Sequence, residues 1–472
     1  MSDSDLETQF PNSAPPPPVE QLDEDDRLKP EFVRSVMEHV EAGDADGARA
    51  LVEPLHPADI ADLFELVASD QRRPLAAALS DLLDGDVFSE MNDWVREDLI
   101  DALEPHEVAD IAGQLDTDDA VALIEDLEED EQRAVLRALD PDDRAAIEEA
   151  LTFPEESAGR LMQRDLIAVP EHWTVGQVID YLRAGDELTT DFWEVFIVDP
   201  QHHPIGTAHL SWILRTPRHV RMADVMKREQ TLIPVEMDQE EVALRFQKYA
   251  LISAAVTDPS GRLVGMITVD DIVHIIQEEA GEDALLLSGA GEGDINEPVK
   301  DSYKARVRWL VANLFTALLA SSVISLFGAA IEQMVALAIL MPIVASIGGN
   351  AATQTMAVAV RALATNQLTQ SNTIRTIKRE IAIALLNGLT IAVLVGFGAA
   401  VVFANPQLGA VIAAAMLINV LIAGLAGVLV PVALERLDQD PAVASTVFVT
   451  MTTDTMGFLA FLGLAVATGL VG

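Results

Sequence analysis

Cysteine is absent from the 472 residues, so disulfide bonds and thiolate metal sites are both excluded. Basic residues are also scarce: 30 lysines and arginines stand against 76 acidic residues, and only six of the 30 are lysine. Because a nucleic-acid-binding surface needs a basic face, nucleic acid is not an expected partner. The acidic bias is typical of salt-adapted, halophile-like proteins, whose charged surfaces stay soluble in concentrated salt.

The acidic excess is confined to one part of the chain. Residues 1–300 hold 69 acidic and 22 basic residues, whereas residues 301–472 hold seven and eight. This asymmetry predicts an acidic soluble region joined to a nearly neutral membrane region. The N-terminus is acidic and lacks the apolar core of a signal peptide. Residues 1–24 are rich in proline and acids without apolar periodicity, and we expect a disordered tail.

A repeat of 12 residues indicates a helical domain over residues 25–155. Each unit places a leucine before an Asp/Glu/Pro turn and then a short helix with apolar residues at helical spacing. Such units cannot bury their apolar faces alone, so we expect them to stack into a small superhelix. The repeated leucines are Leu103, Leu115, Leu127, Leu139 and Leu151.

Residues 156–277 change character, because short β-rich runs alternate with helical stretches. The expected strands are Leu166–Val169, Trp193–Val198, Thr231–Val235 and Leu251–Thr257. The two halves, 156–218 and 219–277, echo each other, and each ends in a glycine-led strand that runs into a helix. The pattern resembles a tandem pair of CBS (cystathionine-β-synthase-type) domains, an α+β regulatory module.

The CBS resemblance implies a nucleotide site, and ATP is the expected ligand in the second half. In that family a Gly-x-x-Ser/Thr-x-x-Asp pattern holds ribose and phosphate, and Gly265, Thr268 and Asp271 match it. Alternatively, Asp271 only caps the helix that follows. The first half keeps a glycine but departs from the pattern, with His209 and Trp212 at the hydroxyl and carboxylate positions.

The composition of residues 278–304 predicts a connecting helix followed by a glycine-rich linker. Acidic side chains crowd a few turns just before the membrane region, and like charges at this spacing repel each other. They are either solvated or bridged by a divalent cation to another acidic surface.

Residues 305–472 predict an all-α transmembrane domain with five helices. The expected spans are Trp309–Phe327, Met334–Ala359, Ile381–Phe403, Leu408–Leu434 and Val443–Val471, each near the ~20 residues that cross a bilayer. Lysine and arginine flank these spans on one side only. The positive-inside rule therefore predicts a multi-pass protein of the cell (plasma) membrane with cytoplasmic N-terminal domains and an extracellular C-terminus.

Polar groups inside two of the spans indicate an ion pathway. In the second span Gly349, Asn350 and Gln354 lie in an otherwise apolar segment, where an unpartnered polar group costs several kcal/mol. They either pack and hydrogen-bond against neighbouring helices or line a hydrated path. Asp454 is the one ionisable residue expected in an apolar centre, with Thr450 and Thr453 on its helical face, and such a carboxylate marks an ion pathway by default.

The order of these parts resembles the MgtE family of magnesium channels, over residues 30–472. The motif that carries the resemblance is Pro-x5-Gly-Gly-Asn-x3-Gln, here Pro342, Gly348, Gly349, Asn350 and Gln354, followed by an aspartate in the last span. The resemblance implies a homodimer in membrane lipid with a Mg²⁺ pore on its two-fold axis. It implies that Asp454 is the central ion-binding residue, beside the backbone and amide of the second span. It further implies a channel and no enzyme.

The resemblance also implies regulation by intracellular Mg²⁺, which would bridge acidic cytoplasmic faces and close the pore through the connecting helix. The residues that match as regulatory ligands are Asp271, Glu279, Glu282, Asp283 and Asp440. Two other functions stay open at this point. One is a transporter of another divalent cation such as Mn²⁺ or Co²⁺. The other is a CBS-bearing membrane sensor without transport.

Overall fold

The computed structural model describes residues 21–101, 103–125, 127–184, 192–288, 295–369, 371–437 and 439–471. The chain divides into two compact units, Met1–Ile276 and Gln277–Gly472. The tail predicted over residues 1–24 falls mostly outside the described residues. Contacts with the rest of the fold begin slightly before residue 25, where the tail was expected to end. Gln21 already donates a hydrogen bond from Nε2 to the Leu51 carbonyl at 3.2 Å.

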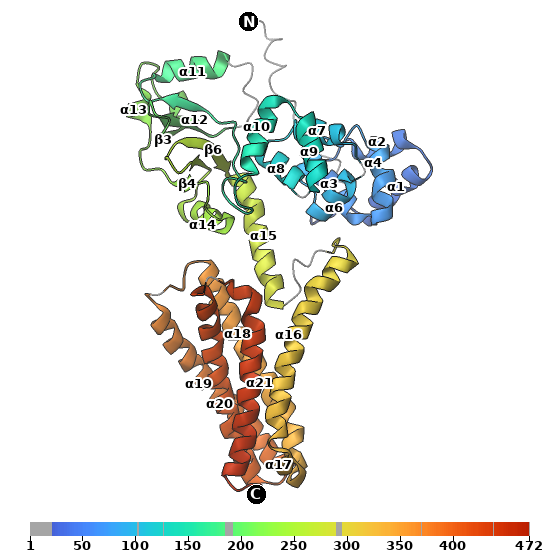
Figure 1. Cartoon of the computed structure of the whole chain (residues 1–472), viewed down its shortest axis with the longest axis vertical. Helices are drawn as coiled ribbons and strands as arrows, with labels where there is room; N and C mark the ends of the chain where they lie inside the picture. The colour runs from blue at the N-terminus through green and yellow to red at the C-terminus, as the bar shows by residue number, and fades with distance from the viewer. Residues whose placement is uncertain are drawn as a thin grey trace. The chain divides into compact units, whose positions relative to one another are not determined.

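The first part of the first unit is a stack of ten short helices (Figure 1). Proline at the first helical position, or an Asp, Asn or His N-cap, starts most of them, because both devices deal with the unpaired N–H groups of a helix start. The repeat leucines lie in or against one apolar core, as predicted. The helices are α1 Pro30–Glu41, α2 Ala45–Val52, α3 Pro57–Leu66, α4 Ser69–Ala78, α5 Gly85–Ser89, α6 Asp93–Ile100, α7 Pro105–Ala112, α8 Thr117–Glu125, α9 Glu129–Ala138 and α10 Pro141–Ala150.

The second part of this unit contains two three-stranded sheets of the same topology. In each sheet the first strand pairs in parallel with the second, and the second pairs antiparallel with the third, with one register shift. The strands are β1 Ala168–Pro170, β2 Glu194–Val198, β3 Pro204–His209, β4 Leu232–Pro234, β5 Ser253–Thr257 and β6 Leu263–Thr268. This duplication confirms the expected pair of halves. Helices α11 Val175–Ala184, α12 Leu210–Arg215, α13 Met222–Val225 and α14 Gln239–Tyr249 accompany the strands.

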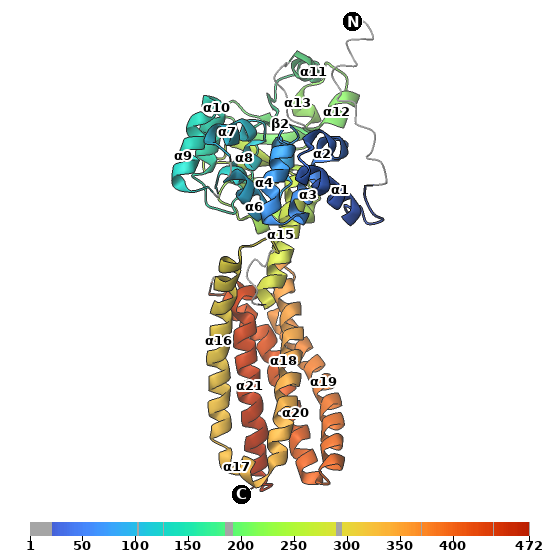
Figure 2. The same cartoon turned by 90° about the vertical axis from the view of Figure 1, so that its right-hand side faces the viewer.

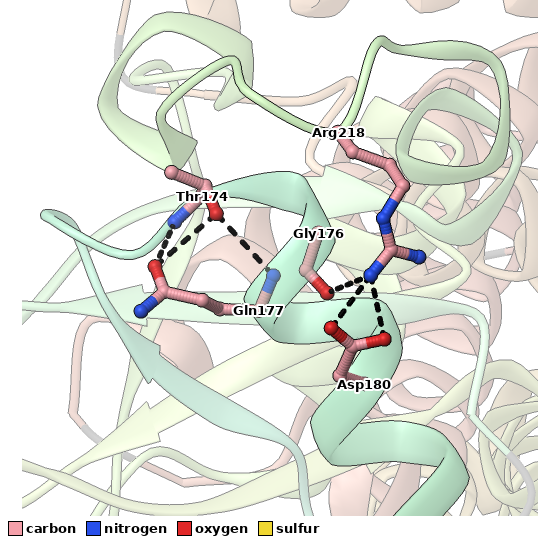
Figure 3. A network of polar contacts seen from close by, with 5 residues as sticks. All are labelled: Thr174, Gly176, Gln177, Asp180 and Arg218. Carbon is pink, nitrogen blue, oxygen red and sulfur yellow. Dashed lines mark hydrogen bonds and ion pairs between the residues drawn. The ribbon is translucent and has the colours of Figure 1, made fainter.

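A polar network closes the first half (Figure 3). Arg218 donates from Nη2 to the Gly176 carbonyl at 3.1 Å and to both carboxylate oxygens of Asp180 at 2.6 Å. Thr174 and Gln177 cap the start of α11, because the backbone N–H of each is bonded to the side chain of the other. The network holds the loop before α13 against α11.

The second unit is a bundle of long helices. They are α16 Val299–Ser325, α18 Val335–Ala364, α19 Thr373–Val402, α20 Pro406–Glu435 and α21 Pro441–Ala467, and all five are long and apolar enough to span a membrane. Figures 1 and 2 show them running alongside one another, with the short helix α17 (Gly328–Gln333) at the end of the bundle where the chain ends. Helix α20 is the most buried and packs against α18, α19 and α21.

Helix α15 (Val269–Ser288) crosses the boundary between the two units. The fold class is therefore as predicted: an all-α superhelical N-terminal domain, an α+β pair, a connecting helix and a five-helix membrane domain. The helices extend past the predicted apolar spans at most ends, because a membrane helix continues through the polar boundary that ends a hydrophobic run.

Candidate ion pathway

Asp454 lies in α21 with its carboxylate half-buried. Within the part of the chain that the structure describes, no hydrogen bond or ion pair engages this carboxylate. Thr453, one residue before, is fully buried and donates its hydroxyl to the Thr450 carbonyl at 3.0 Å. Thr450 itself is partly buried. A carboxylate that no basic neighbour neutralises is the arrangement expected of an ion-binding group rather than of a structural ion pair.

The polar residues of α18 around the Gly-Gly-Asn motif, which we call the polar stripe, lie on an exposed face of this helix. Asn350, Thr353 and Gln354 are exposed on the single chain. A Cβ on Gly349 would meet no described atom within 4 Å, so the backbone at this position is open. Because α18 is long and apolar enough to span a membrane, this face must contact water or another protein there.

Asn419 of α20 joins the two helices that carry these groups, and the sequence analysis missed it. Its side chain is fully buried, and its amide donates to the Val344 carbonyl of α18 at 2.9 Å. Its Oδ1 has no N–H or O–H donor among the described residues. A Cβ on either Gly348 of α18 or Gly457 of α21 would lie 2.9 Å from the Asn419 Cγ and closer still to its Nδ2, so both glycines approach this amide too closely to carry a side chain.

This junction, which we call the Asn419 clamp, consists of Asn419, Val344, Gly348 and Gly457. It explains the first glycine of the Gly-Gly-Asn motif, because a side chain at Gly348 would collide with the Asn419 amide. Gly457 lies one turn after Asp454. The clamp therefore sets the spacing between the polar segment of α18 and the turn of α21 that carries the acid. The sequence signal that could have pointed to the clamp is the amide of Asn419 in the middle of α20, the span with the highest mean hydropathy.

A second acid lies in a helix that is long and apolar enough to span a membrane. Helix α19 begins at Thr373 and includes Glu380, which is 6% exposed. The predicted apolar span starts at Ile381, one residue after Glu380, because the run of charged residues ends there. Gln354 lines a cavity together with Glu380, between α18, α19 and α20. Gln354 thus borders a cavity that α19 and α20 also line.

Among the predicted regulatory residues, the structure brings Asp283 and Asp440 close together. Burial raises the pKa of Asp283, and the negative charge of Asp440 raises it further. Asp440 also caps α21, since its Oδ1 accepts a hydrogen bond from the Ala442 N–H at 2.7 Å. Glu279 is partly buried and Glu282 is exposed on the same helix as Asp283.

The last turns of α15 dock on the pathway helices. Leu286 and Leu287 pack against an apolar cluster formed by α18, α20 and α21, and Thr446 of α21 donates its hydroxyl to the Leu287 carbonyl at 2.7 Å. The predicted connecting helix therefore contacts both α18 and α21.

Asp271 faces acidic residues of the helical-repeat domain that the sequence could not assign. Burial, followed by neighbouring carboxylates, raises the pKa of Asp119 to about 6 and that of Asp118 well above its usual range. Burial also raises the pKa of Asp271 to about 6. Asp118 is 8% exposed, and its Oδ1 lacks a hydrogen-bond partner among the described residues. Nothing in the motifs could single out these acids, because the whole soluble surface is acidic.

This acidic cluster comprises Asp116, Asp118, Asp119 and Asp271. Among the described residues, no group of three or more His, Cys, Asp or Glu is placed to hold a bare metal ion.

In the second half, two residues of the nucleotide motif are hydrogen-bonded to each other. In the first half, other residues stand at the corresponding positions. Thr268 donates its hydroxyl to Asp271 Oδ2 at 2.7 Å, and the same carboxylate oxygen accepts from the Thr268 N–H at 3.4 Å. The capping alternative for Asp271 is therefore realised. Gly265 lies on β6. In the first half, His209 Nδ1 lies 2.9 Å from a carboxylate oxygen of the buried Glu194. ATP binding at Gly265, Thr268 and Asp271 stays a prediction.

Comparison with known proteins places these features in one family. The family model described as a divalent cation transporter, MgtE, matches residues 341–464, which include both the polar segment of α18 and Asp454. The magnesium transporter MgtE of Bacillus subtilis is 30% identical over 425 residues, covering 89% of this chain and 93% of its own length. The chain belongs to the MgtE family.

Other matches cover the rest of the chain. The MgtE intracellular N domain matches residues 55–156, and a CBS domain matches residues 222–278. The magnesium transporter MgtE of Thermus thermophilus is 30% identical, over 91% of this chain and 97% of its own. A solved cytosolic domain of the Mg²⁺ channel MgtE in complex with ATP is 27% identical, with a TM-score of 0.47 over 52% of this chain and 99% of that chain. Like other MgtE proteins, this chain is a multi-pass membrane protein.

Proposed function

We propose that this MgtE chain forms a homodimeric channel that carries Mg²⁺ across the cell membrane into the cytoplasm and closes when intracellular Mg²⁺ binds its acidic domains. The observation that carries the proposal is the half-buried Asp454 carboxylate, which no hydrogen bond or ion pair engages among the described residues. The names of the two 30%-identical relatives support magnesium as the transported ion.

A second copy of the chain would cover membrane-spanning surfaces that are exposed on one copy. The polar face of α18 and most of α16 are exposed on the single chain, although α16 and α18 both have the length and hydropathy of membrane spans. In a symmetric dimer, the polar faces of the two α18 helices would cover each other. Two copies of Asn350 and of Asp454 would then lie around one axis, shielded from lipid. Membrane lipid would then contact the apolar faces of the remaining helices.

The expected chemistry at the axis is the capture of a hydrated ion. Mg²⁺ prefers oxygen ligands in octahedral geometry and keeps several of its waters. Two carboxylates, two Asn350 amides, the open Gly349 backbone and the Thr450 hydroxyls provide oxygen donors for those waters. A ring of acidic side chains also attracts cations and repels anions. Selection of magnesium over calcium would come from the size of the hydrated cavity, because charge alone does not distinguish the two ions.

The basic residues support a cytoplasmic location of the acidic unit. They gather in the first turns of α16, in the last turn of α18, in the first turns of α19 and just after α20, and they are absent from the connections at the other end of the bundle. By the positive-inside rule, the N-terminal domains would lie in the cytoplasm and the C-terminus outside. Magnesium entering along the axis would then emerge where α15 docks on α18 and α21.

Closure would use the two acidic pairings described above. Carboxylates that repel each other when bare are held together when a divalent ion lies between them. The pair Asp283 and Asp440 would fasten α15 to α21, and the acidic cluster at Asp271 would fasten the helical-repeat domain to the CBS pair. Each ion would thereby favour the conformation in which the connecting helix obstructs the pathway.

Transport itself is tested with purified protein in liposomes that contain a Mg²⁺ indicator. We expect Mg²⁺ influx that saturates with concentration and exceeds Ca²⁺ influx at least tenfold. Faster flux of Mn²⁺ or Co²⁺ than of Mg²⁺ would favour a transporter of those ions. A flat signal for every divalent cation would favour a sensor that transports nothing.

The pKa shifts at the acidic cluster predict how closure depends on pH. Asp119 and Asp271 have raised pKa values of about 6, so their burial as anions opposes folding increasingly as pH rises from about 4 to 6. Below that range both are protonated and offer no site for a cation. We therefore expect 10 mM Mg²⁺ to raise the unfolding temperature of the acidic unit by several degrees at pH 7.5 and by less than one degree at pH 4.5.

Tryptophan fluorescence of the full chain in detergent measures this effect, because four of the five tryptophans lie in the first unit. The double variant Asp118→Asn/Asp119→Asn is the matched control, and its Mg²⁺ effect should fall by half or more at pH 7.5. An equal Mg²⁺ effect at both pH values would contradict ion binding at this cluster.

A further inference from the structure

Two adjoining cavities form a cleft between α18, α19 and α20, away from Asp454. Their volumes are about 190 and 320 Å³, and both are lined by Thr355, Val358, Arg379 and Glu380. The lining is mixed, with polar side chains among apolar ones at both ends. Gln354 and Asn387 line one end, and Gln367 and Thr376 line the other. We call this cavity the Glu380 cleft.

The cleft reaches deep into the membrane-spanning part of the bundle. Its lining on α19 runs from Thr376 to Asn387, which is roughly 16 Å at the rise of an α-helix. Amides and a carboxylate at this depth are costly unless water or a ligand meets them. A dry cleft would leave several of these groups in hydrocarbon, so the lining indicates a hydrated recess that begins at the basic end of the bundle.

Glu380 is the anionic group of the recess, and its one ion-pair partner among the described residues is an arginine that is mostly exposed. Its side chain is 8% exposed, and its Oε1 lies 2.8 Å from Nη1 of Arg379, whose side chain is 64% exposed. Most of the Arg379 side chain stays in solvent, so only the carboxylate end of this ion pair is buried. The arginine can therefore swing into solvent when another cation takes its place beside the carboxylate.

We propose that the Glu380 cleft is a second cation site, which holds a hydrated divalent ion on the cytoplasmic side of the membrane domain. Glu380 would provide the charge, while the side-chain oxygens of Gln354 and Asn387 accept hydrogen bonds from the waters of the ion. A single carboxylate among neutral oxygens suits an ion that keeps its hydration shell, as Mg²⁺ does. The choice of a divalent ion rests on the proposed transport function, whereas the hydration of the cleft does not.

The absence of cysteine makes the test direct, since every introduced thiol is unique. Val358→Cys and Ile383→Cys place a thiol in the lining, and Leu386→Cys places one on an exposed apolar face of the same helix α19. The full chain in liposomes is treated from the side of the acidic domains with membrane-impermeant cationic or anionic methanethiosulfonates. We expect both lining thiols to react at least tenfold faster than Leu386→Cys, and the cationic reagent to react faster than the anionic one.

Binding is measured as protection of the lining thiols by Mg²⁺, in a background that carries Asp454→Ala. We expect saturating Mg²⁺ to slow the reaction at least threefold. Glu380→Gln should abolish this protection. Arg379→Gln should have the opposite effect, because it removes the competing cation, and the Mg²⁺ concentration that gives half-protection should fall several-fold. Two variants with opposite expected shifts separate loss of the site from loss of the fold.

Three results would overturn the proposal. Lining thiols that react no faster than Leu386→Cys would show a dry cleft. Reactive thiols that Mg²⁺ does not protect would show a hydrated recess without a cation site. Protection that survives Glu380→Gln, or that requires Asp454, would assign the ion to another site. Because protection is measured without flux, it can fail while transport through Asp454 succeeds, and the reverse also holds.

Discussion

Substituting Asp454 by asparagine is expected to lower Mg²⁺ influx in liposomes about hundredfold while the protein stays folded. The change removes one negative charge from each copy and keeps the size of the side chain. A loss of about 1.4 kcal/mol of ion stabilisation per copy is a factor of ten, so two copies give roughly a hundred. The measurement is the initial rate of Mg²⁺ entry at a concentration well below saturation.

Asp301→Asn is the matched control for Asp454→Asn. Asp301 is an exposed acid at the start of α16 that pairs with Lys304 at 2.6 Å, outside the pathway. Its loss should change influx less than twofold. If Asp454→Asn kept more than half of the wild-type influx, the lone carboxylate would not be the group that binds the ion.

The second large effect is expected at the Asn419 clamp. Gly348→Ala and Gly457→Ala each place a methyl group against the Asn419 amide, and overpacking of this kind costs about 1–3 kcal/mol. Because the clamp sets the spacing of α18 and α21, we expect each variant to lower Mg²⁺ influx at least tenfold. Each should also raise the Ca²⁺ to Mg²⁺ influx ratio, since the selective cavity is distorted.

A double-variant cycle distinguishes this steric role from general damage. Asn419→Ala removes the side chain that the new methyl group meets, so Gly457→Ala should lose most of its harmful effect in that background. Gly463→Ala lies six residues further along α21, where a Cβ meets no described atom within 4 Å, and should change influx less than twofold. Additive effects of Gly457→Ala and Asn419→Ala would contradict the clamp.

Periodicity and local composition were enough to predict the architecture. The 12-residue leucine repeat anticipated the stacked helices, and runs such as Trp193–Val198 and Leu251–Thr257 anticipated strands β2 and β5. These features are local, because helix and strand periods are determined by neighbouring residues. The polar stripe of α18 could likewise be predicted, since side chains three or four positions apart share one face.

Contacts between distant segments could not be predicted from local patterns. Asn419 and Val344 are 75 positions apart, and only packing shows that this amide reaches α18. Glu380 was hidden because it follows Lys378 and Arg379 and therefore seems to belong to a charged loop. Asp118 and Asp119 carry no signal in an acidic domain, and only the folded structure shows that they are buried near Asp271.

The family resemblance predicted roles for several residues, and these roles stay predictions. Asp283 and Asp440 were matched by motif alone, and the structure places them close enough for the Asp440 charge to raise the pKa of Asp283. The resemblance named Gln354 as a pathway residue, and the structure adds that it borders the Glu380 cleft.

The most direct test of the central claim is an experimental structure of the full chain with Mn²⁺, recorded at the absorption edge of manganese. The account predicts a dimer with an anomalous peak between the two Asp454 carboxylates, at a distance that leaves room for water ligands. An empty axis, with Asp454 turned toward lipid or paired with a basic side chain, would contradict it.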